Sequence, residues 1–431
     1  MVYRDRGFNK EIDAFNQDLE HTNFEELVFE KKKVDVFNVL GMDSVFQVMY
    51  GFFEKDSMHF MVKRYDKFIQ LRDSSTFIKI HKRDIRKRIG SVESEDKSKV
   101  LLYTFDIQNR FVYVLYDNRR KKVIRSQKVY VENADLRNDI LEIQIMNSGK
   151  FLLVLNEDQK FEDSDVLRLL LFDISFDGYK SVRMNFSSFY RKSYFLDFDN
   201  LNGKIIICGT YSEKRGKETK GFYYINRSID DLTGNERVYF IDFDLELQNE
   251  IMHGKKKKSR IFDDLEIKDI INRNDGGFLI VSEIAREFSR RNPYNNSYSR
   301  STYNGYSRRG WIDYYNDDIL ISNINSENVL EWTEVLYKKQ FSQDDEAVFS
   351  SFYLMKTPSR MRFIYNDEIK SSNTVSEYIM DPIGNIARNS LLTTEYQNMK
   401  LRFQDAVQLS SNSILVPSEK NYNLNLVRIT Y

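Results

Sequence analysis

A tight polar turn followed at once by an apolar strand recurs along this chain, and the recurrence limits the folds that it can adopt. Two clear examples are NGK at 202–204 before III at 205–207, and NDGG at 274–277 before FLIV at 278–281. Such turns often need a residue with positive φ, which Gly and Asn adopt most readily. The flanking strands alternate apolar and polar residues with a period of two. The pattern predicts an all-β, antiparallel protein.

The strands fall into seven groups, and the last group is incomplete. Its strands are expected at 401–409, 413–416 and 423–430, and a strand at 24–29 is available to complete it. Completion from the N-terminal side closes a ring and removes two exposed sheet edges. We therefore predict a seven-bladed β-propeller whose last blade is completed by an N-terminal strand. Two β-sandwiches are the alternative, but they do not explain the incomplete group.

The predicted propeller domain covers residues 24–431 and follows a polar segment at 1–23. Within that segment, residues 10–19 have the pattern of a short amphipathic helix. The chain provides about 60 residues per group, more than a propeller blade of roughly 40 to 50 needs. Two polar segments account for the excess: a charged stretch at 82–99, predicted to be a solvated connector, and the long excursion at 286–315.

Composition narrows the possible partners and compartments. The 65 basic and 65 acidic residues cancel, so no global field attracts nucleic acid or an anionic membrane. The single cysteine, Cys208, lies in an apolar strand and is predicted to be a small buried side chain. Residues 1–10 contain no apolar signal-peptide core, which fits a mature envelope protein without its leader or a cytoplasmic protein. No apolar run reaches the length of a membrane-spanning helix.

No residue set points to a reaction, a metal or a cofactor. The four histidines have no metal-ligand spacing, and the nucleotide-binding and serine-nucleophile motifs are missing. Acidic pairs at 317–318, 344–345 and 367–368 are expected by chance among 65 acidic residues. The acidic segment 157–165 lacks the glycine of a calcium loop. We therefore predict a protein that is not an enzyme and carries no cofactor.

The excursion at 286–315 is the main binding candidate, because it interleaves arginines with aromatic residues. Tyr, Arg and Trp dominate the anchors of protein interfaces, and the same mixture can stack on single-stranded nucleic acid. The neutral net charge favours a protein partner. A second candidate, the basic run at 255–260, is interpreted as a solvated turn. The predicted partner-binding residues are Arg290, Arg291, Tyr294, Tyr298, Arg300, Tyr303, Tyr306, Arg308, Arg309 and Trp311.

Several short motifs in the C-terminal half resemble a family of envelope β-propeller proteins from the Bacteroidota. They are YNDDILI at 315–321, LEW at 330–332, KQ at 339–340, SSF at 350–352 and FIYND at 363–367, with VPSEK at 416–420 near the end. The resemblance to this family covers about residues 264–431. The chain also resembles the propeller that plugs the periplasmic mouth of the type 9 secretion translocon. The motifs imply structure rather than an active site.

Fold and resemblance together predict a non-catalytic propeller that binds another protein in the bacterial envelope. The resemblance implies a periplasmic protein and an outer-membrane transport barrel as the partner. The alternative is a propeller enzyme or carbohydrate-binding protein with its site in the central channel. The chain has only two tryptophans, Trp311 and Trp332, which makes aromatic platforms for sugars a weaker interpretation.

Overall fold

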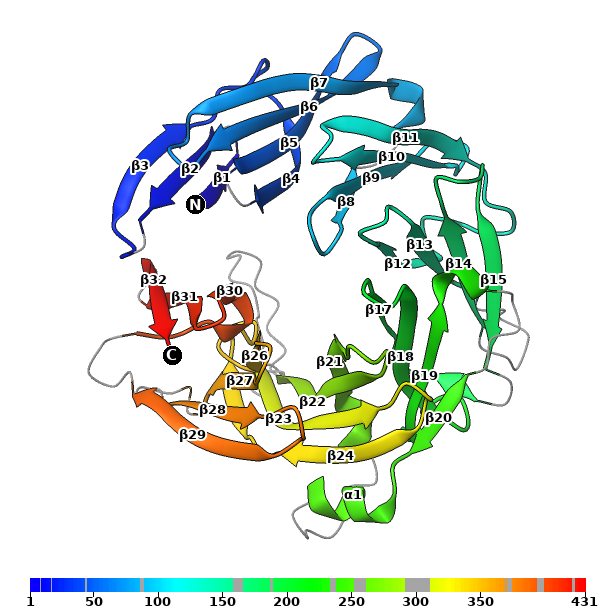
Figure 1. Cartoon of the computed structure of the whole chain (residues 1–431), viewed down its shortest axis with the longest axis vertical. Helices are drawn as coiled ribbons and strands as arrows, with labels where there is room; N and C mark the ends of the chain where they lie inside the picture. The colour runs from blue at the N-terminus through cyan, green and yellow to red at the C-terminus, as the bar shows by residue number, and fades with distance from the viewer. Residues whose placement is uncertain are drawn as a thin grey trace, which may run out of the picture. The chain divides into compact units, whose positions relative to one another are not determined.

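The strands form eight antiparallel sheets, each built from strands that follow one another in the chain (Figure 1). A succession of such up-and-down sheets is the organisation of a β-propeller. Contacts divide the chain into two compact units, whose boundary runs through the fifth sheet. The computed structural model describes residues 1–7, 9–16, 18–42, 45–85, 89–157, 166–186, 189–232, 238–251, 261–290, 311–367, 369, 374–393, 399–420 and 423–431.

The first four sheets belong to the first unit. Sheet one consists of β1 (Val2–Arg6), β2 (Asn9–Phe15) and β3 (His21–Glu26). Sheet two consists of β4 (Asp35–Met42), β5 (Val45–Glu54), β6 (Ser57–Asp66) and β7 (Leu71–His81). Sheet three consists of β8 (Gly90–Glu93), β9 (Lys99–Phe105), β10 (Phe111–Asp117) and β11 (Lys122–Val129). Sheet four consists of β12 (Ile140–Ile145), β13 (Phe151–Asn156), β14 (Val166–Phe172) and β15 (Lys180–Asn185).

Sheet five contributes to both units, and the last three sheets belong to the second. Sheet five consists of β16 (Tyr190–Arg191), β17 (Phe195–Asp199), β18 (Lys204–Ser212), β19 (Gly221–Ser228) and β20 (Tyr239–Asp242). Sheet six consists of β21 (Leu265–Asn272), β22 (Phe278–Arg290), β23 (Trp311–Ile324), β24 (Leu330–Leu336) and β25 (Gln340–Gln343). Sheet seven consists of β26 (Phe352–Lys356), β27 (Met361–Asn366), β28 (Thr374–Met380) and β29 (Ile386–Thr393). Sheet eight consists of β30 (Val407–Ser410), β31 (Ser413–Lys420) and β32 (Asn423–Thr430).

Helices are few and short in the part of the chain that the structure describes. None of them is long and apolar enough to cross a lipid bilayer. They are α1 (Leu245–Ile251) and the 3-10 turns η1 (Lys82–Asp84), η2 (Ile229–Asp231), η3 (Ile261–Asp264) and η5 (Phe403–Asp405).

A five-residue turn capped by its own first side chain joins strands in several sheets. Asp66 shows the arrangement: its carboxylate accepts hydrogen bonds from the backbone N–H groups of Phe68 and Gln70, at 2.8 and 2.9 Å. The residue three places after the cap, here Ile69, has a φ of 62°. This local bonding defines the hairpin from residues that are close in the sequence. Equivalent turns begin at Asn16, Asp106, Asn325 and Asp381.

In the first unit, successive sheets pack face to face. Phe60 of sheet two shares a core with Val114 of sheet three. The next core joins sheets three and four, where the rings of Phe151 and Phe172 stack at 4.6 Å. Both central strands β10 and β14 are buried at every residue, because they are covered on both faces. Full burial of each such aliphatic or aromatic side chain contributes about 1.5–3 kcal/mol.

The second unit repeats this packing. Val281 and Ile321 of sheet six share a core with Phe363 of sheet seven. Sheets seven and eight meet through Met355 and Ile414. Sheets three and seven therefore each pack against a neighbour on both faces, which a pair of β-sandwiches would not require. The β-propeller prediction is confirmed.

The predicted blade number is wrong, because the structure has eight blades rather than seven. The extra blade is sheet one, formed where the sequence predicted a polar segment with a helix at 10–19. The polar composition conceals a period-two pattern in β2, which buries Ile12 and Ala14 against Val48 and Tyr50 of sheet two. Local hydrogen bonding at the Asn16 turn and this burial outweigh the helical pattern.

The predicted completion of the last blade by a strand at 24–29 is also wrong. Phe24 lies in β3 and pairs with Asp13 of β2, and β3 ends at Glu26. Within the described residues, sheet eight contains β30, β31 and β32 alone. The short turn after Asn16 brings β3 beside β2 at a small loop-closure cost, whereas pairing with a strand some 400 residues away costs more.

The predicted connector at 82–99 is partly ordered β structure. Residues 90–93 form β8, which pairs with β9 and completes sheet three. The strand is only four residues long, and its single large apolar side chain, Val92, gives too little periodicity to predict it.

Candidate partner-binding face and the polar network beneath it

Two strands of sheet six, β22 and β23, continue beyond the strands that flank them. β21 pairs with β22 only as far as Ile284, and β24 pairs with β23 only from Ile319 onward. Past these points β23 acquires a different neighbour, because residues 313–316 pair with β25. The outer parts of β22 and β23 and the whole of β25 thus form a three-stranded extension, which we call the sheet-six extension.

One face of the sheet-six extension carries large aromatic side chains. Tyr315 pairs with Phe341 across the strands, and the period of two places Phe288 and Trp311 on the same side. The Tyr315 ring lies 5.8 Å from the ring of Phe288 and 5.1 Å from that of Phe341. Phe288, Trp311 and Phe341 are 52, 48 and 40% exposed. We call Phe288, Trp311, Tyr315 and Phe341 the aromatic face.

A cation lies beside this face. The Arg286 guanidinium is 5.6 Å from the Tyr315 ring centroid, within the range of a cation–π contact. Arg286 also forms an ion pair with Asp317, which fixes its position. Aromatic rings next to an anchored arginine are the residue types that contribute most to protein interfaces.

The other side of the sheet-six extension is covered by the chain itself. The Ser342 hydroxyl lies 3.0 Å from that of Ser350, and it donates a hydrogen bond to Asp345 at 2.8 Å. Asn316 and Gln340, which pair across β23 and β25, are both buried. The extension therefore has one packed face and one aromatic face.

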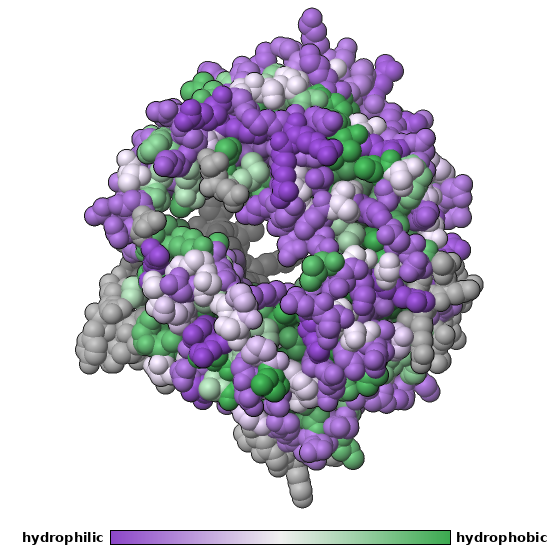
Figure 2. All heavy atoms as spheres, viewed as in Figure 1, coloured by the Kyte–Doolittle hydropathy of each residue, from purple (hydrophilic) through white to green (hydrophobic). Residues whose placement is uncertain are grey.

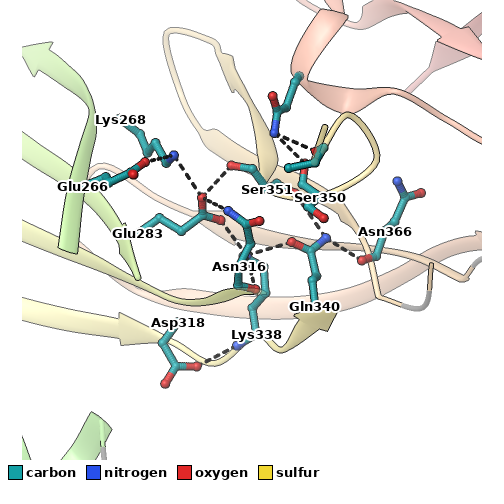
Figure 3. Close-up of polar contacts among 12 residues, drawn as sticks. Glu266, Lys268, Glu283, Asn316, Asp318, Lys338, Gln340, Ser350, Ser351 and Asn366 are labelled. Carbon is teal, nitrogen blue, oxygen red and sulfur yellow. Dashed lines mark hydrogen bonds and ion pairs between the residues drawn. The ribbon is translucent and has the colours of Figure 1, made fainter. Parts of the chain in front are cut away.

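A buried ion pair lies beneath the extension, at its junction with the rest of sheet six. The Glu283 carboxylate and the Lys338 ammonium are 2.6 Å apart, and both side chains are 0% exposed. Figure 3 shows Glu283 surrounded by its partners: Asn316 donates to the carboxylate at 2.9 Å, Ser351 donates at 2.7 Å, and Lys268 approaches to 3.4 Å.

The surroundings hold Glu283 in its charged form. Burial by itself would raise the pKa of this carboxyl, but the charges of Lys338 and Lys268, together with hydrogen bonds from Lys338 and Ser351, outweigh burial and bring the pKa below its ordinary value. Burial lowers the pKa of the Lys338 ammonium, because its desolvation exceeds the attraction of Glu283. The two residues therefore depend on each other. The charge of Lys338 helps to keep Glu283 ionised, and the charge of Glu283 offsets part of the desolvation of Lys338.

The network continues from the ion pair into sheets seven and eight. Lys338 donates to the side-chain oxygen of Gln340 at 2.9 Å, and Gln340 donates to the Asn366 carbonyl at 2.6 Å. The Asn366 amide in turn donates to the carbonyls of Phe349 and Leu401, at 2.9 and 2.8 Å. These bonds fasten β25 and the loop before β26 beneath the extension.

Four of the six motifs that carry the family resemblance meet in this network, although these four are spread over about 50 residues of sequence. Their members in it are Asn316, Asp318, Gln340, Ser350, Ser351 and Asn366 (Figure 3). The two charged residues at the centre, Glu283 and Lys338, were not predicted from the sequence. A glutamate two positions after the end of the apolar run 278–281 is the signal that could have revealed the first of them.

The ten predicted binding residues have different outcomes. Trp311 lies on the aromatic face, as the first residue of β23. Arg290 is the last residue of β22, and the structure describes its backbone alone. The other eight lie outside the described residues; they are Arg291, Tyr294, Tyr298, Arg300, Tyr303, Tyr306, Arg308 and Arg309. The basic run at 255–260 also lies outside them. The exposed rings of Phe288 and Phe341 were missed, because a single aromatic residue in a strand predicts burial as readily as binding.

The acidic pairs noted in the sequence perform structural tasks. Asp318 accepts the Lys338 backbone N–H at 2.9 Å, and Asp344 accepts that of Ile312 at 2.8 Å. Asp367 accepts hydrogen bonds from Ser376 and Arg388. In the described ranges, no group of three or more His, Cys, Asp or Glu side chains is arranged to hold a metal ion. Cys208 is fully buried, as predicted.

Comparisons with known proteins show likeness in fold only. No family model and no curated protein matches the chain. Among solved structures, the β-propeller domain of the Trilobed protease from Pyrococcus furiosus, described as having an open velcro topology, is 11% identical, with 92% of this chain and 95% of that chain covered and a TM-score of 0.42. The Dos1 propeller is 10% identical, with 96% and 81% covered and a TM-score of 0.43. An ulvan lyase of polysaccharide lyase family 25 is 10% identical, with 91% of each chain covered and a TM-score of 0.39.

Proposed function

We propose that this protein is a β-propeller binding subunit that holds a protein partner on the aromatic face of the sheet-six extension. The observation that carries the proposal is the exposure of Phe288, Trp311 and Phe341, at 40–52%, on one face of the sheet-six extension. Figure 2 shows one side of the molecule, where polar side chains predominate and apolar ones form small separate patches. Large exposed rings gathered on one strand face mark an interaction site in a surface of this kind.

The strands that carry the rings reduce the cost of binding. Each ring projects from a hydrogen-bonded strand, so little conformational entropy is lost when a partner packs against it. The buried network fixes β25, and with it Phe341, relative to β22 and β23. A preorganised row of aromatic anchors next to Arg286 suits a partner segment that presents apolar side chains.

The partner and its location are the finer part of the proposal. We propose an outer-membrane transport barrel that presents its periplasmic loops to the aromatic face. Two features support this choice: the resemblance to envelope propellers, and the position of the resembling residues on β23 and in the network beneath the face. The same resemblance supports a periplasmic location and a role in protein secretion of the type 9 kind.

The test is capture of the partner followed by measurement of its affinity. The tagged protein is incubated with detergent-solubilised native membranes, and a stoichiometric partner is identified by mass spectrometry and purified. A variant with Phe288→Ser, Trp311→Ser and Phe341→Ser should then bind the purified partner at least about 100-fold more weakly, because central aromatic anchors contribute about 2 kcal/mol or more each. Site-specific photocrosslinking from position 341 should label the same partner.

A matched control removes three apolar side chains of similar exposure elsewhere. Phe68, Ile107 and Leu201 are 60, 63 and 73% exposed, and none lies in sheet six. The triple serine variant at these positions should bind the partner as the parent protein does. Equal affinity of the aromatic-face variant and the parent, or recovery of the protein only as a free monomer, would contradict the proposal.

A further inference from the structure

A hollow of about 510 Å³ opens between sheets six and seven at the end opposite the extension. It lies among the hairpin turns that join β21 to β22, β23 to β24, β26 to β27 and β28 to β29. All of its lining residues belong to the second unit. Its volume is within the range of pockets that hold small molecules, about 300–1,000 Å³.

The floor of this hollow is the open end of the core between the two sheets. Leu279 and Met380 are buried there, and the half-buried side chains of Trp332 and Met361 pack against the same core. At the mouth, Ile383 is 82% exposed. An apolar ligand body can therefore extend the core outward and cover these side chains.

The charged groups of the rim are paired, with one exception. Arg273 binds Glu331 at 2.9 Å and Asp275 at 2.7 Å, and Lys356 binds Asp269 at 2.6 Å. Asp381, which caps its turn through the Ile383 and Asn385 backbone N–H groups, is also engaged.

The exception is Arg360. It is exposed on the rim, and no described residue forms an ion pair or a side-chain hydrogen bond with its guanidinium. The hollow thus combines an apolar floor with one cation that the protein itself does not neutralise.

We infer that this hollow binds a small amphipathic carboxylate, with the apolar body of the ligand on Trp332 and Met361 and its carboxylate on Arg360. A guanidinium can receive a carboxylate through two parallel hydrogen bonds, which selects an anion over a neutral amide of the same shape. The apolar body supplies most of the affinity through burial, and the arginine supplies the selectivity for charge. This site is independent of the aromatic face and of the proposed partner.

The two tryptophans of the chain allow a direct test. Trp311→Phe leaves Trp332 as the sole tryptophan, so its fluorescence reports on the hollow. Octanoate is titrated into this variant below its micellar concentration, with octanamide as the neutral probe. Octanoate should shift the Trp332 emission to shorter wavelength with a saturable curve, and octanamide should bind about tenfold more weakly.

Arg360→Gln in the same background should weaken octanoate binding about tenfold and leave octanamide binding unchanged. Arg120→Gln is the matched control, because Arg120 is an arginine outside the hollow whose side chain is 73% exposed. Thermal melting by circular dichroism checks that each variant is folded. An unchanged Trp332 emission, equal affinities for the two probes, or an equal loss with Arg120→Gln would each overturn the inference.

Discussion

The two ends of sheets six and seven handle charge in opposite ways. At the network end, below the extension, Glu283 and Lys338 are removed from water completely and lie 2.6 Å apart. At the turn end, Arg360 is exposed and the Arg273–Glu331 pair keeps contact with water, and the space between the sheets is left as a hollow of about 510 Å³. Sheets with similar strand patterns are thus closed by a polar network at one end and left open at the other.

The difference follows from the cost of desolvation. A buried charge must be paired and hydrogen-bonded. Removing any residue of the network would leave a buried polar group without a partner, so the network holds its strands in one geometry. An exposed arginine needs no protein partner, because water already solvates it. Rigidity at the network end suits the support of a binding face, and an open rim suits exchange of a small ligand.

The largest expected effect is the loss of a buried charge. Glu283→Ala removes the counter-charge of a fully buried ammonium, which should destabilise the protein by about 3–5 kcal/mol. Glu331→Ala removes a comparable partner of Arg273 at the turn end, where the pair is partly exposed to water, and should cost less than about 1 kcal/mol. Urea unfolding followed by tryptophan fluorescence measures both.

Lys338→Met refines the same comparison. This variant leaves Glu283 with the nearby ammonium of Lys268, at 3.4 Å, and with the hydrogen bond from Ser351. Lys338→Met should therefore reduce stability less than Glu283→Ala does. In the Glu283→Ala variant, Lys338 keeps no anionic contact as close. Similar losses for Glu283→Ala and Glu331→Ala would show that the two ends do not differ in the way described.

Sequence patterns were sufficient to predict those parts of the fold that depend on hydrogen bonds between residues close in the chain. The turns at Asp66, Asn325 and Asp381 each bond their own backbone, so residues close in sequence determine the hairpins and the all-β class. The propeller followed from counting such units. The count failed by one because β2 is polar, and its burial depends on Val48 and other residues of the next sheet.

The candidate site was predictable only in part, for a similar reason. Trp311 could be identified from the arginine- and aromatic-rich segment to which it belongs. The pairing of Glu283 with Lys338 spans 55 positions and depends on how two hairpins meet, which local patterns do not encode. Phe341 reaches the aromatic face because β25 pairs with β23, and this too is a tertiary contact.

An intermediate effect is expected at the turn end from Gly384→Ala. Gly384 has a φ of 98°, which L-residues rarely adopt, and an added Cβ would lie 3.2 Å from the Trp332 ring. The variant should lose about 1–2 kcal/mol of stability, since backbone strain and ring displacement add together. In the Trp311→Phe background, a changed Trp332 emission measures the displacement directly. An unaltered emission would show that the hollow adjusts without moving its floor.

The smallest effect is expected on the aromatic face. Phe341→Ser removes a side chain that is 40% exposed and contacts Tyr315 at 5.1 Å, so stability should fall by about 1 kcal/mol or less. The same substitution should weaken binding of the proposed partner by roughly 2 kcal/mol, because the ring is then buried in the interface. Urea unfolding and titration with the purified partner measure the two quantities on one sample. A large loss of stability with unchanged partner affinity would make Phe341 part of the support, together with Glu283 and Lys338, rather than part of the binding surface.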